Sequence, residues 1–254
     1  MIDLIVFSIG TNKYAINIEN IQRIIQAVSL TNIPNANSII DGMMSHEDKV
    51  IKVLNFRKLI SMQSYDEELA TLFVKLKAAH GAWVEALQIA VTTKSEFTKT
   101  TNPHMCELGK WIDSFTSYDD SIAMIFSNLV ENHKQLHLKG QDILDMNKVD
   151  ESKAKKMLDI DINNIYVKTM GALDTFTKEL ETVANSLQKL VIYEQDNKVF
   201  AIKVDAIEDI VHADESSIMS SSDEESKSDY LELEGVLDLD GVLVNMIKKV
   251  NIPH

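Results

Sequence analysis

Three histidines and the single cysteine are the residues whose types and spacing suggest chemistry in this chain. His133 and His137 are four residues apart, and on a helix this spacing places both imidazoles on one face, about one turn apart. His80 lies within an apolar helical pattern, and Cys106 follows a proline-containing break. Imidazole nitrogens and thiolate sulfur are donors that Zn2+ prefers, so the four residues form a candidate tetrahedral zinc site.

Each of these residues also has an ordinary alternative. Pairs with HxxxH spacing are common on helix surfaces, and a histidine on an apolar stripe, such as His80, is usually a core residue bonded to a local acceptor. A lone cysteine is commonly a small buried hydrophobe. Cys106, however, lies near an expected helix N-terminus, where free N–H groups and the helix dipole favour the thiolate.

Four protein ligands leave no coordination position for a substrate water, so the expected zinc is structural or sensory rather than hydrolytic. The sequence contains no HExxH helix, P-loop or nucleophile elbow. We therefore predict a protein that is not an enzyme, and a zinc-dependent enzyme is the least favoured alternative.

Charge and composition narrow the classes of partner. A net charge of −14 disfavours nucleic acid and anionic membrane surfaces, because phosphate binding needs clustered Lys and Arg. No stretch approaches the roughly 18 apolar residues of a membrane span, and the N-terminal pattern suits a strand better than a signal peptide. One cysteine excludes an intramolecular disulfide. We expect a cytoplasmic globular protein without direct membrane insertion.

The middle of the chain, about residues 64–188, carries apolar residues at helical spacing. Clear stripes run over 69–87 and 122–136, and a looser one continues over 157–187. Pro103 lies in a link between the first two stripes, where it favours a break in the helix. Amphipathic helices joined by short links are typical of an antiparallel bundle, here of four-helix type.

The flanking segments, residues 1–63 and 189–254, change to the pattern of strands. Hairpin signatures surround the turn-forming stretches Gly10–Lys13 and Asp196–Lys198. This order allows either two separate β domains or one β domain interrupted by a helical insertion. The stretch Asp214–Asp229 is rich in Ser, Asp and Glu, cannot bury a core, and is predicted to be an exposed, mobile loop and a candidate for phosphorylation.

The candidate ligands and their neighbours resemble the chemoreceptor zinc-binding (CZB) domain. The family patterns HxxW, CxLGxW and HxxxH match His80–Trp83, Cys106–Trp111 and His133–His137. The resemblance covers roughly residues 64–188 and implies that His80, Cys106, His133 and His137 bind Zn2+. The other matching positions, Trp83, Gly109 and Trp111, are expected to support the metal site.

The flanks resemble CheW-like domains, in which two small five-stranded β-barrels form an adaptor. The matching stretches keep the family order, and they are Phe7–Ile18, Ile33–Gly42, Val53–Arg57, Lys198–Ile207 and Gly235–Leu243. The resemblance favours one α+β multidomain chain, a CheW-like double β-barrel interrupted by the bundle. Its expected parts are 1–63 and 189–254 for the CheW-like domain and 64–188 for the CZB insertion.

CheW-like domains join the histidine kinase CheA to chemoreceptor tips, so the resemblance implies those partners and a place at chemoreceptor arrays. It also implies a homodimer through the bundle, since related zinc modules are often dimeric. The predicted partner-binding residues are Gly42, Glu47 and Arg57. Glu47 stands where the family's "NLRG" stretch has an arginine, and such a charge reversal changes partner choice.

These resemblances lead to a switch hypothesis. Zinc would tie together the helices that carry its ligands, and loss of zinc or oxidation of Cys106 would loosen them. Because the bundle interrupts the β domain, a helix shift would alter the docking surface. The alternative is a purely structural zinc that stabilises the bundle and leaves adaptor binding unchanged.

Overall fold

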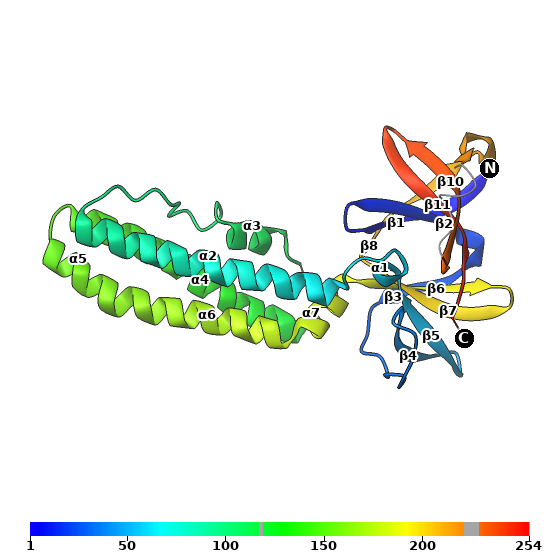
Figure 1. Cartoon of the computed structure of the whole chain (residues 1–254), viewed down its shortest axis with the longest axis horizontal. Helices are drawn as coiled ribbons and strands as arrows, with labels where there is room; N and C mark the ends of the chain where they lie inside the picture. The colour runs from blue at the N-terminus through cyan, green and yellow to red at the C-terminus, as the bar shows by residue number, and fades with distance from the viewer. Residues whose placement is uncertain (117–118, 221–228, 254) are drawn as a thin grey trace. The chain divides into compact units, whose positions relative to one another are not determined.

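The computed structural model describes residues 1–116, 119–220 and 229–253, and it consists of two compact units. The β unit comprises Met1–Tyr65 and Ala184–His254, and the helical unit comprises Asp66–Val183 (Figure 1). The predicted α+β class is confirmed, with strands toward both ends of the chain and helices in the middle. Within the described ranges, no helix is long and apolar enough to cross a membrane.

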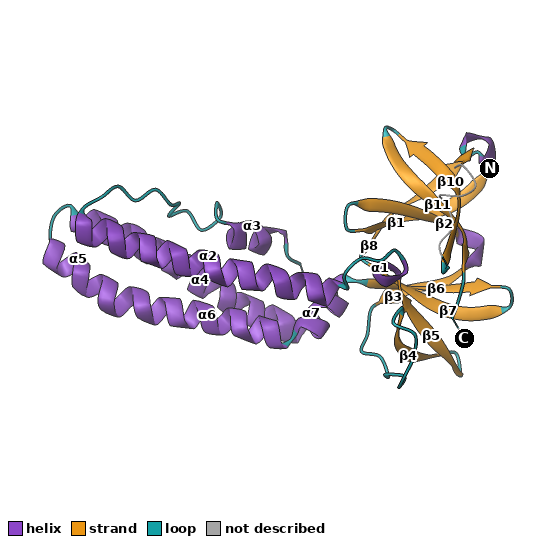
Figure 2. Ribbon diagram, in the orientation of Figure 1, coloured by secondary structure: helices purple, strands orange, loops and turns teal. Residues whose placement is uncertain are grey.

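The first sheet of the β unit has the strand order β8-β1-β2-β11-β10-β9 (Figure 2). Its strands are β1 (Ile2–Ile9), β2 (Asn12–Asn17), β8 (Ala206–Ala213), β9 (Met219–Ser220), β10 (Leu231–Leu239) and β11 (Val242–Val250). Gly10 turns β1 into β2 with φ +57°, a conformation that glycine adopts without strain. The short β9 pairs with β10 and gives this sheet six strands, where the resemblance predicts five.

The second sheet has the order β3-β6-β7-β5-β4. Its strands are β3 (Ile21–Gln26), β4 (Ile40–His46), β5 (Lys49–Asn55), β6 (Lys189–Gln195) and β7 (Lys198–Val204). The short helix α1 (Phe56–Leu59) follows β5 directly, and the Asn55 side chain caps it by accepting from the Lys58 amide.

Strands from either side of the helical segment pair with one another. β3 pairs with β6, with Ile24 opposite Val191, and β1 pairs with β8, with Leu4 opposite Val211. The two sheets share one apolar core, to which β1 contributes Phe7. The two β segments therefore fold as one domain, which decides between the two arrangements that the sequence left open.

The helical unit is built from long amphipathic helices, as the apolar stripes predict. Its elements, with the helix that leads back into the β unit, are α2 (Tyr65–Thr93), α3 (Glu107–Ser114), α4 (Asp120–Asn147), α5 (Glu151–Met157), a π-turn (Leu158–Ile162), α6 (Asn163–Lys178) and α7 (Leu180–Leu187). Asp119 caps α4 and Asp150 caps α5, each by accepting from backbone amides of the first turn. A buried cluster that includes Leu87, Leu136 and Leu158 joins α2, α4 and the π-turn.

α2 and α4 run parallel, although the described residues between them contain no long helix. His80 lies against His133 near the helix middles, and near the C-terminal ends Asn147 Nδ2 donates to the Val91 carbonyl at 3.4 Å. The cause is the link over residues 94–106, which returns along the bundle without forming a helix (Figure 1). Its Thr, Asn and Pro residues are poor helix formers, so an extended segment takes the place of a return helix.

α5 and α6 run antiparallel to α2, as predicted. Lys94, just after the end of α2, pairs with Glu151 at the start of α5 at 2.9 Å, whereas Lys77, earlier in α2, pairs with Asp174 late in α6. The π-turn interrupts the stripe that the sequence pattern treats as one loose helix. Leu158 and Ile162 of this turn are buried, so the extra residue in the turn keeps both on the core side.

The Ser- and acid-rich stretch is more ordered at its start than predicted. Glu215–Ser217 form a 3-10 turn capped by Asp214, and Met219–Ser220 form β9. The prediction of an irregular loop is therefore wrong for these residues, because local capping and pairing with β10 order them. The remaining residues, 221–228, lie outside the described part of the chain.

Candidate metal centre

The four predicted ligands lie together in the helical unit. His80 comes from the middle of α2, His133 and His137 come from one face of α4, and Cys106 comes from the residue before α3. One potential ligand atom from each residue lies within 4.8 Å of all the others. The three imidazoles are buried, with 3%, 2% and 0% of their surface exposed, so the cluster is enclosed.

The separations fit a small tetrahedral ion. Cys106 Sγ lies 3.1 Å from His133 Nε2 and 3.8 Å from His80 Nε2. Zinc–sulfur and zinc–nitrogen bonds of ordinary length at tetrahedral angles place sulfur and nitrogen about 3.6 Å apart. The cluster therefore needs only small adjustments to hold Zn2+.

Hydrogen bonds indicate which nitrogens are free to bind an ion. His80 Nδ1 lies 2.8 Å from the Leu76 carbonyl, and because a carbonyl can only accept, Nδ1 carries the proton and Nε2 faces Cys106 with a lone pair. Neither nitrogen of the fully buried His137 has a hydrogen-bond partner of good geometry among the described residues. Buried polar atoms are rarely left without a partner, so this imidazole is suited to a bound ligand.

Burial also keeps the imidazoles neutral. It lowers the pKa of His133 to about 3, and the neighbouring imidazoles of His137 and His80 add to this shift. Burial, together with His80, lowers the pKa of His137 to about 4, against a small opposite effect of the Thr100 carbonyl. The pKa of His80 is lowered for the same main reason. Neutral imidazole is the form that binds metal, so these shifts prepare the site.

Cys106 behaves differently from the prediction that its helix N-terminus favours the thiolate. Its sulfur accepts from the Gly109 amide at 3.3 Å, and such bonds lower the thiol pKa. Burial has the larger effect and raises the pKa of Cys106, and the negative charge of Asp113 adds to the rise. A cation in the cluster would supply the missing stabilisation of the thiolate.

Gly109 lies where the first turn of α3 meets the link. A Cβ at this residue would lie 1.7 Å from the Pro103 carbonyl oxygen, so no other residue fits without moving the backbone. This close approach lets the first turn of α3 lie against the link and present its amide to Cys106. Gly109 therefore positions the sulfur ligand.

Trp83 contacts both the link and a candidate ligand. Its indole Nε1 donates to the Thr100 carbonyl at 2.8 Å, and its ring centroid lies 4.9 Å from that of His137. Gly140 makes room for the ring, since a Cβ there would lie 2.3 Å from the indole. Sequence reasoning missed Gly140, although its spacing of three from His137 places it on the same helix face.

Trp111 anchors α3 to the bundle. Its ring centroid lies 5.1 Å from that of Phe73 in α2 and 5.7 Å from that of Phe176 in α6. Trp111 therefore contacts the candidate metal site only indirectly, by holding α3, the helix that follows Cys106.

Two further histidines among the described residues lie outside the cluster. His104 is exposed, with Nδ1 3.0 Å from both Asp113 oxygens. His212 is exposed and pairs with Asp3 in the β unit.

The three predicted partner-binding residues occupy unlike environments. Glu47 is exposed at the tip of the β4–β5 hairpin, where Glu47 and Asp48 have φ of 46° and 61°. Gly42 is buried, and a Cβ there would lie 2.7 Å from the Thr31 carbonyl oxygen. Arg57 is 1% exposed and forms an ion pair with Asp205 at 2.7 Å. The described structure therefore gives Gly42 and Arg57 internal contacts, and Glu47 alone of the three reaches solvent.

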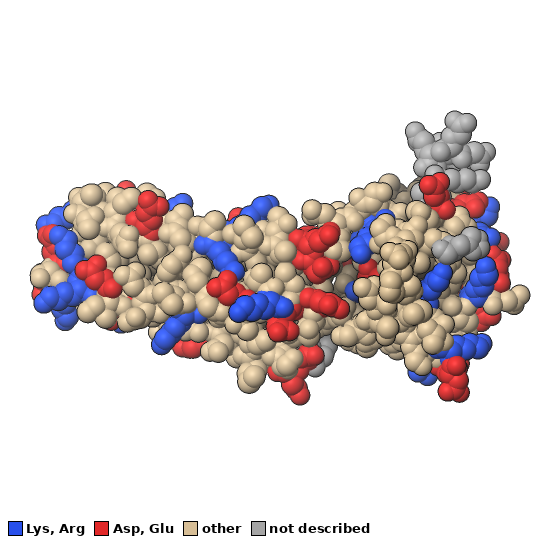
Figure 3. Space-filling view, turned by 60° about the horizontal axis from the view of Figure 1, so that its bottom comes forward, with Lys and Arg blue, Asp and Glu red and all other residues tan. Residues whose placement is uncertain are grey.

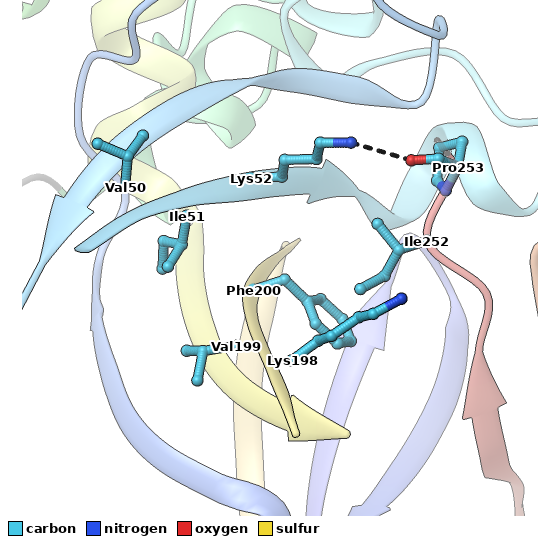
Figure 4. A pocket seen from close by; sticks show the side chains of 8 residues that line it. All are labelled: Val50, Ile51, Lys52, Lys198, Val199, Phe200, Ile252 and Pro253. Atoms are coloured by element: carbon cyan, nitrogen blue, oxygen red, sulfur yellow. Dashed lines mark hydrogen bonds between the residues drawn. The ribbon is translucent and has the colours of Figure 1, made fainter. Parts of the chain in front are cut away.

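A pocket of about 360 Å³ opens on the surface of the β unit (Figure 4). Apolar side chains, among them Phe200 and Ile252, line it beside Lys52 and Lys198, and Lys52 donates to the Pro253 carbonyl at 3.0 Å. Elsewhere, on the face shown in Figure 3, acidic and basic side chains are interspersed. The candidate ligands contribute nothing to this pocket.

Comparison with known proteins gives two family matches. Residues 3–84 match the CheW-like domain, and residues 80–144 match the chemoreceptor zinc-binding domain. The second range begins at His80 and contains the other three candidate ligands.

Two solved structures are similar at low sequence identity. The scaffolding protein TtCheW from Thermoanaerobacter tengcongensis is 13% identical with a TM-score of 0.46, over 98% of this chain and 90% of that chain. The regulatory CZB domain of DgcZ is 15% identical with a TM-score of 0.39, over 46% of this chain and 98% of that chain. No match was found among curated protein sequences.

Proposed function

The chain joins a CheW-like domain to a chemoreceptor zinc-binding domain, and from this premise we propose a non-enzymatic chemotaxis adaptor that binds one zinc ion. The adaptor domain would comprise residues 1–63 and 189–254, and the zinc-binding insertion residues 64–188. The observation that carries the zinc assignment is the enclosed group of three neutral imidazoles and one thiol, with no carboxylate among them.

The four proposed ligands have complementary roles. His80 would bind through Nε2, because its Nδ1 is engaged with the Leu76 carbonyl, an arrangement that orients a metal-binding imidazole. Cys106 would bind as the thiolate and lose its proton when zinc enters. Bound zinc would supply the positive charge that makes this thiolate stable. With four protein donors, the metal has no position left for a substrate, which supports a sensory or structural role.

The proposed partners follow from the CheW-like domain. They are a CheA-type histidine kinase and chemoreceptor tips, in arrays at the cytoplasmic side of the membrane. Glu47 is the candidate contact that determines partner choice, because it is exposed at a hairpin tip and carries a charge opposite to that of arginine. A homodimer through the helical unit is also proposed.

One observation favours a sensory role for the zinc, and another favours a purely structural role. Cys106 is only partly buried and is the one ligand that oxidants attack readily, which favours oxidant sensing. The deep burial of the three histidines favours a permanently bound, structural zinc. Release of zinc on oxidation of Cys106, with changed binding to the kinase, would support sensing. Unchanged binding after zinc loss would support the structural alternative.

The first experiment is the zinc content of the purified chain by mass spectrometry, under reducing conditions. We expect one zinc per chain in the wild type and strongly reduced zinc in Cys106→Ala. His104→Ala is the matched control, because His104 is close in sequence yet exposed and outside the cluster. A wild type without zinc, or a Cys106→Ala variant that keeps a full equivalent, would contradict the proposal.

A further inference from the structure

A buried polar cluster in the β unit lies where the helical insertion leaves and rejoins that unit. At its centre is Arg57 of α1, which is 1% exposed. Its Nε donates to Asp205 Oδ1 at 2.8 Å and to Oδ2 at 3.0 Å, and its Nη2 donates to Oδ2 at 2.7 Å. A fork of this kind holds both side chains in one geometry.

The start of the insertion is held by Arg57. Its Nη1 donates to the Gln63 carbonyl at 3.4 Å, and its guanidinium carbon lies 4.6 Å from the centre of the Tyr65 ring. Tyr65 is the first residue of α2, the helix that carries His80. At about 1.5 Å per residue, His80 lies roughly 22 Å farther along the same helix. The contact between Tyr65 and Arg57 therefore lies on the same continuous helix as His80.

The end of the insertion is held by Asp205, the carboxylate that pairs with Arg57. Gln188, which follows α7, donates from Nε2 to Asp205 Oδ1 at 3.1 Å. Gln26 of β3 donates to the carbonyls of Asn185 at 2.5 Å and Gln188 at 2.7 Å, and so caps the last turn of α7. Movement of α7 therefore acts on Asp205 directly.

Asp205 also lies at the crossing between the two sheets. It is the single residue between β7, in the second sheet, and β8, in the first sheet. Its backbone amide donates to the Ser8 carbonyl of β1 at 3.2 Å, and its Oδ2 accepts from the Gly10 amide of the β1–β2 turn at 2.7 Å. Asp205 thus bonds the end of the insertion and the turn of the first sheet directly, and it reaches the start of the insertion through Arg57.

We propose that the Arg57–Asp205 pair couples the helical insertion to the first sheet, so that a change in the bundle is transmitted to the β1–β2 turn through Asp205. Zinc as the physiological signal rests on the function proposed above. The coupling itself rests on the hydrogen bonds within the β unit.

The test is amide hydrogen exchange of the full chain, read at Gly10. The bundle is loosened in two independent ways, by a zinc chelator and by Leu87→Ala, which removes a fully buried side chain from the helical core. In both cases we expect exchange at Gly10 to rise about tenfold, as when one hydrogen bond to a charged group is weakened by about 1.4 kcal/mol. Gly241 is the matched control, because its amide also donates to a turn carboxylate, that of Asp238, at 2.7 Å. Its exchange is expected to stay constant.

A matched pair of substitutions then tests the route. Gln188→Met removes the bond to Asp205 with little change in volume, and we expect zinc content to be kept while the response at Gly10 is reduced to what the Tyr65–Arg57 contact still transmits. Gln195→Met removes a comparable glutamine that bonds Val250 instead, and the response is expected to remain.

The outcomes separate the two proposals. If exchange rises in α2 and α4 but stays unchanged at Gly10 under both perturbations, the coupling is overturned. If the chelator changes no amide while Leu87→Ala raises exchange at Gly10, the coupling stands and the zinc proposal fails.

Discussion

The molecule has two buried polar clusters that differ in how their atoms are satisfied. In the helical unit, neither nitrogen of His137 has a hydrogen-bond partner of good geometry among the described residues, and burial lowers the pKa of each of the three clustered histidines. In the β unit, both oxygens of Asp205 accept hydrogen bonds from Arg57 and from a further donor. Burying polar atoms without partners is costly, so the first cluster is explained by a ligand that completes it. The second is complete in itself and serves the connection between chain segments.

The comparison also corrects a reading of the motifs. Both clusters lie in stretches that resemble family patterns, and the sequence assigned metal binding to one and partner binding to Arg57 in the other. Burial separates them, since an arginine that is 1% exposed and forms an ion pair within the domain has no surface to offer a partner. The resemblance to CheW-like domains marks Arg57 as an important position, and its buried ion pair with Asp205 accounts for that importance.

The largest expected effect is that of Arg57→Met on the β unit. It leaves the largely buried Asp205 carboxylate without its counter-charge, and breaking such a pair costs about 3–5 kcal/mol. Exchange of the slowest amides in β1 and β6 measures this loss, which is expected with and without zinc. Lys77→Met is the control, because its pair with Asp174 is largely solvent-exposed and such pairs contribute little to stability. Equal losses of stability in the two variants would contradict the large contribution assigned to the buried Arg57–Asp205 pair.

The pH dependence of the zinc-free helical unit is the next effect. The folded pKa values of His133 and His137, about 3 and about 4, lie below the unfolded value of about 6.5. As pH falls below about 6.5, the unfolded chain takes up protons first, so stability that is present above this pH is lost. The loss approaches about 1.4 kcal/mol per pH unit for each histidine, down to pH 4.

This dependence is measured by urea unfolding at pH 7, 6 and 5 in the presence of a chelator. The two tryptophans, Trp83 and Trp111, both lie in the helical unit, so their fluorescence reports on that unit separately. His137→Leu is expected to reduce the slope, because it removes one of the three histidines whose pKa is lowered on folding. A midpoint that stays constant from pH 7 to 5 would show that the imidazoles are not held neutral.

The smallest expected effect is a gain, not a loss, in the stability of the helical unit. In zinc-free protein, His137→Leu removes a buried imidazole without partners and is expected to stabilise the helical unit by about 1–3 kcal/mol. The same variant should lose the stabilisation by zinc, which reaches about 4 kcal/mol when free zinc is 1,000 times the dissociation constant. Tryptophan fluorescence with and without zinc measures both. A zinc-free variant less stable than the wild type would mean that the cluster is satisfied without a metal.

Much of the helical unit was predictable because its signals are local. The apolar stripes predicted α2 and α4, and the resemblance of the stretch after Cys106 to the family pattern marked Gly109 as an expected supporting position. The direction of α4 was not predictable from stripes alone, because a stripe does not report how the preceding link runs. Gly140 escaped notice because the feature that requires glycine there is the ring of Trp83, on another helix.

The sequence by itself determined the class of each segment and the four candidate ligands, because donor type and helical spacing are properties of short stretches of chain. The tertiary structure alone decided that α2 and α4 run parallel, that Arg57 faces inward, and that the Arg57–Asp205 pair contacts both ends of the insertion. Arg57 and Asp205 are 148 residues apart in sequence. Contacts over such separations depend on how the two β segments pair, and no local pattern encodes that pairing.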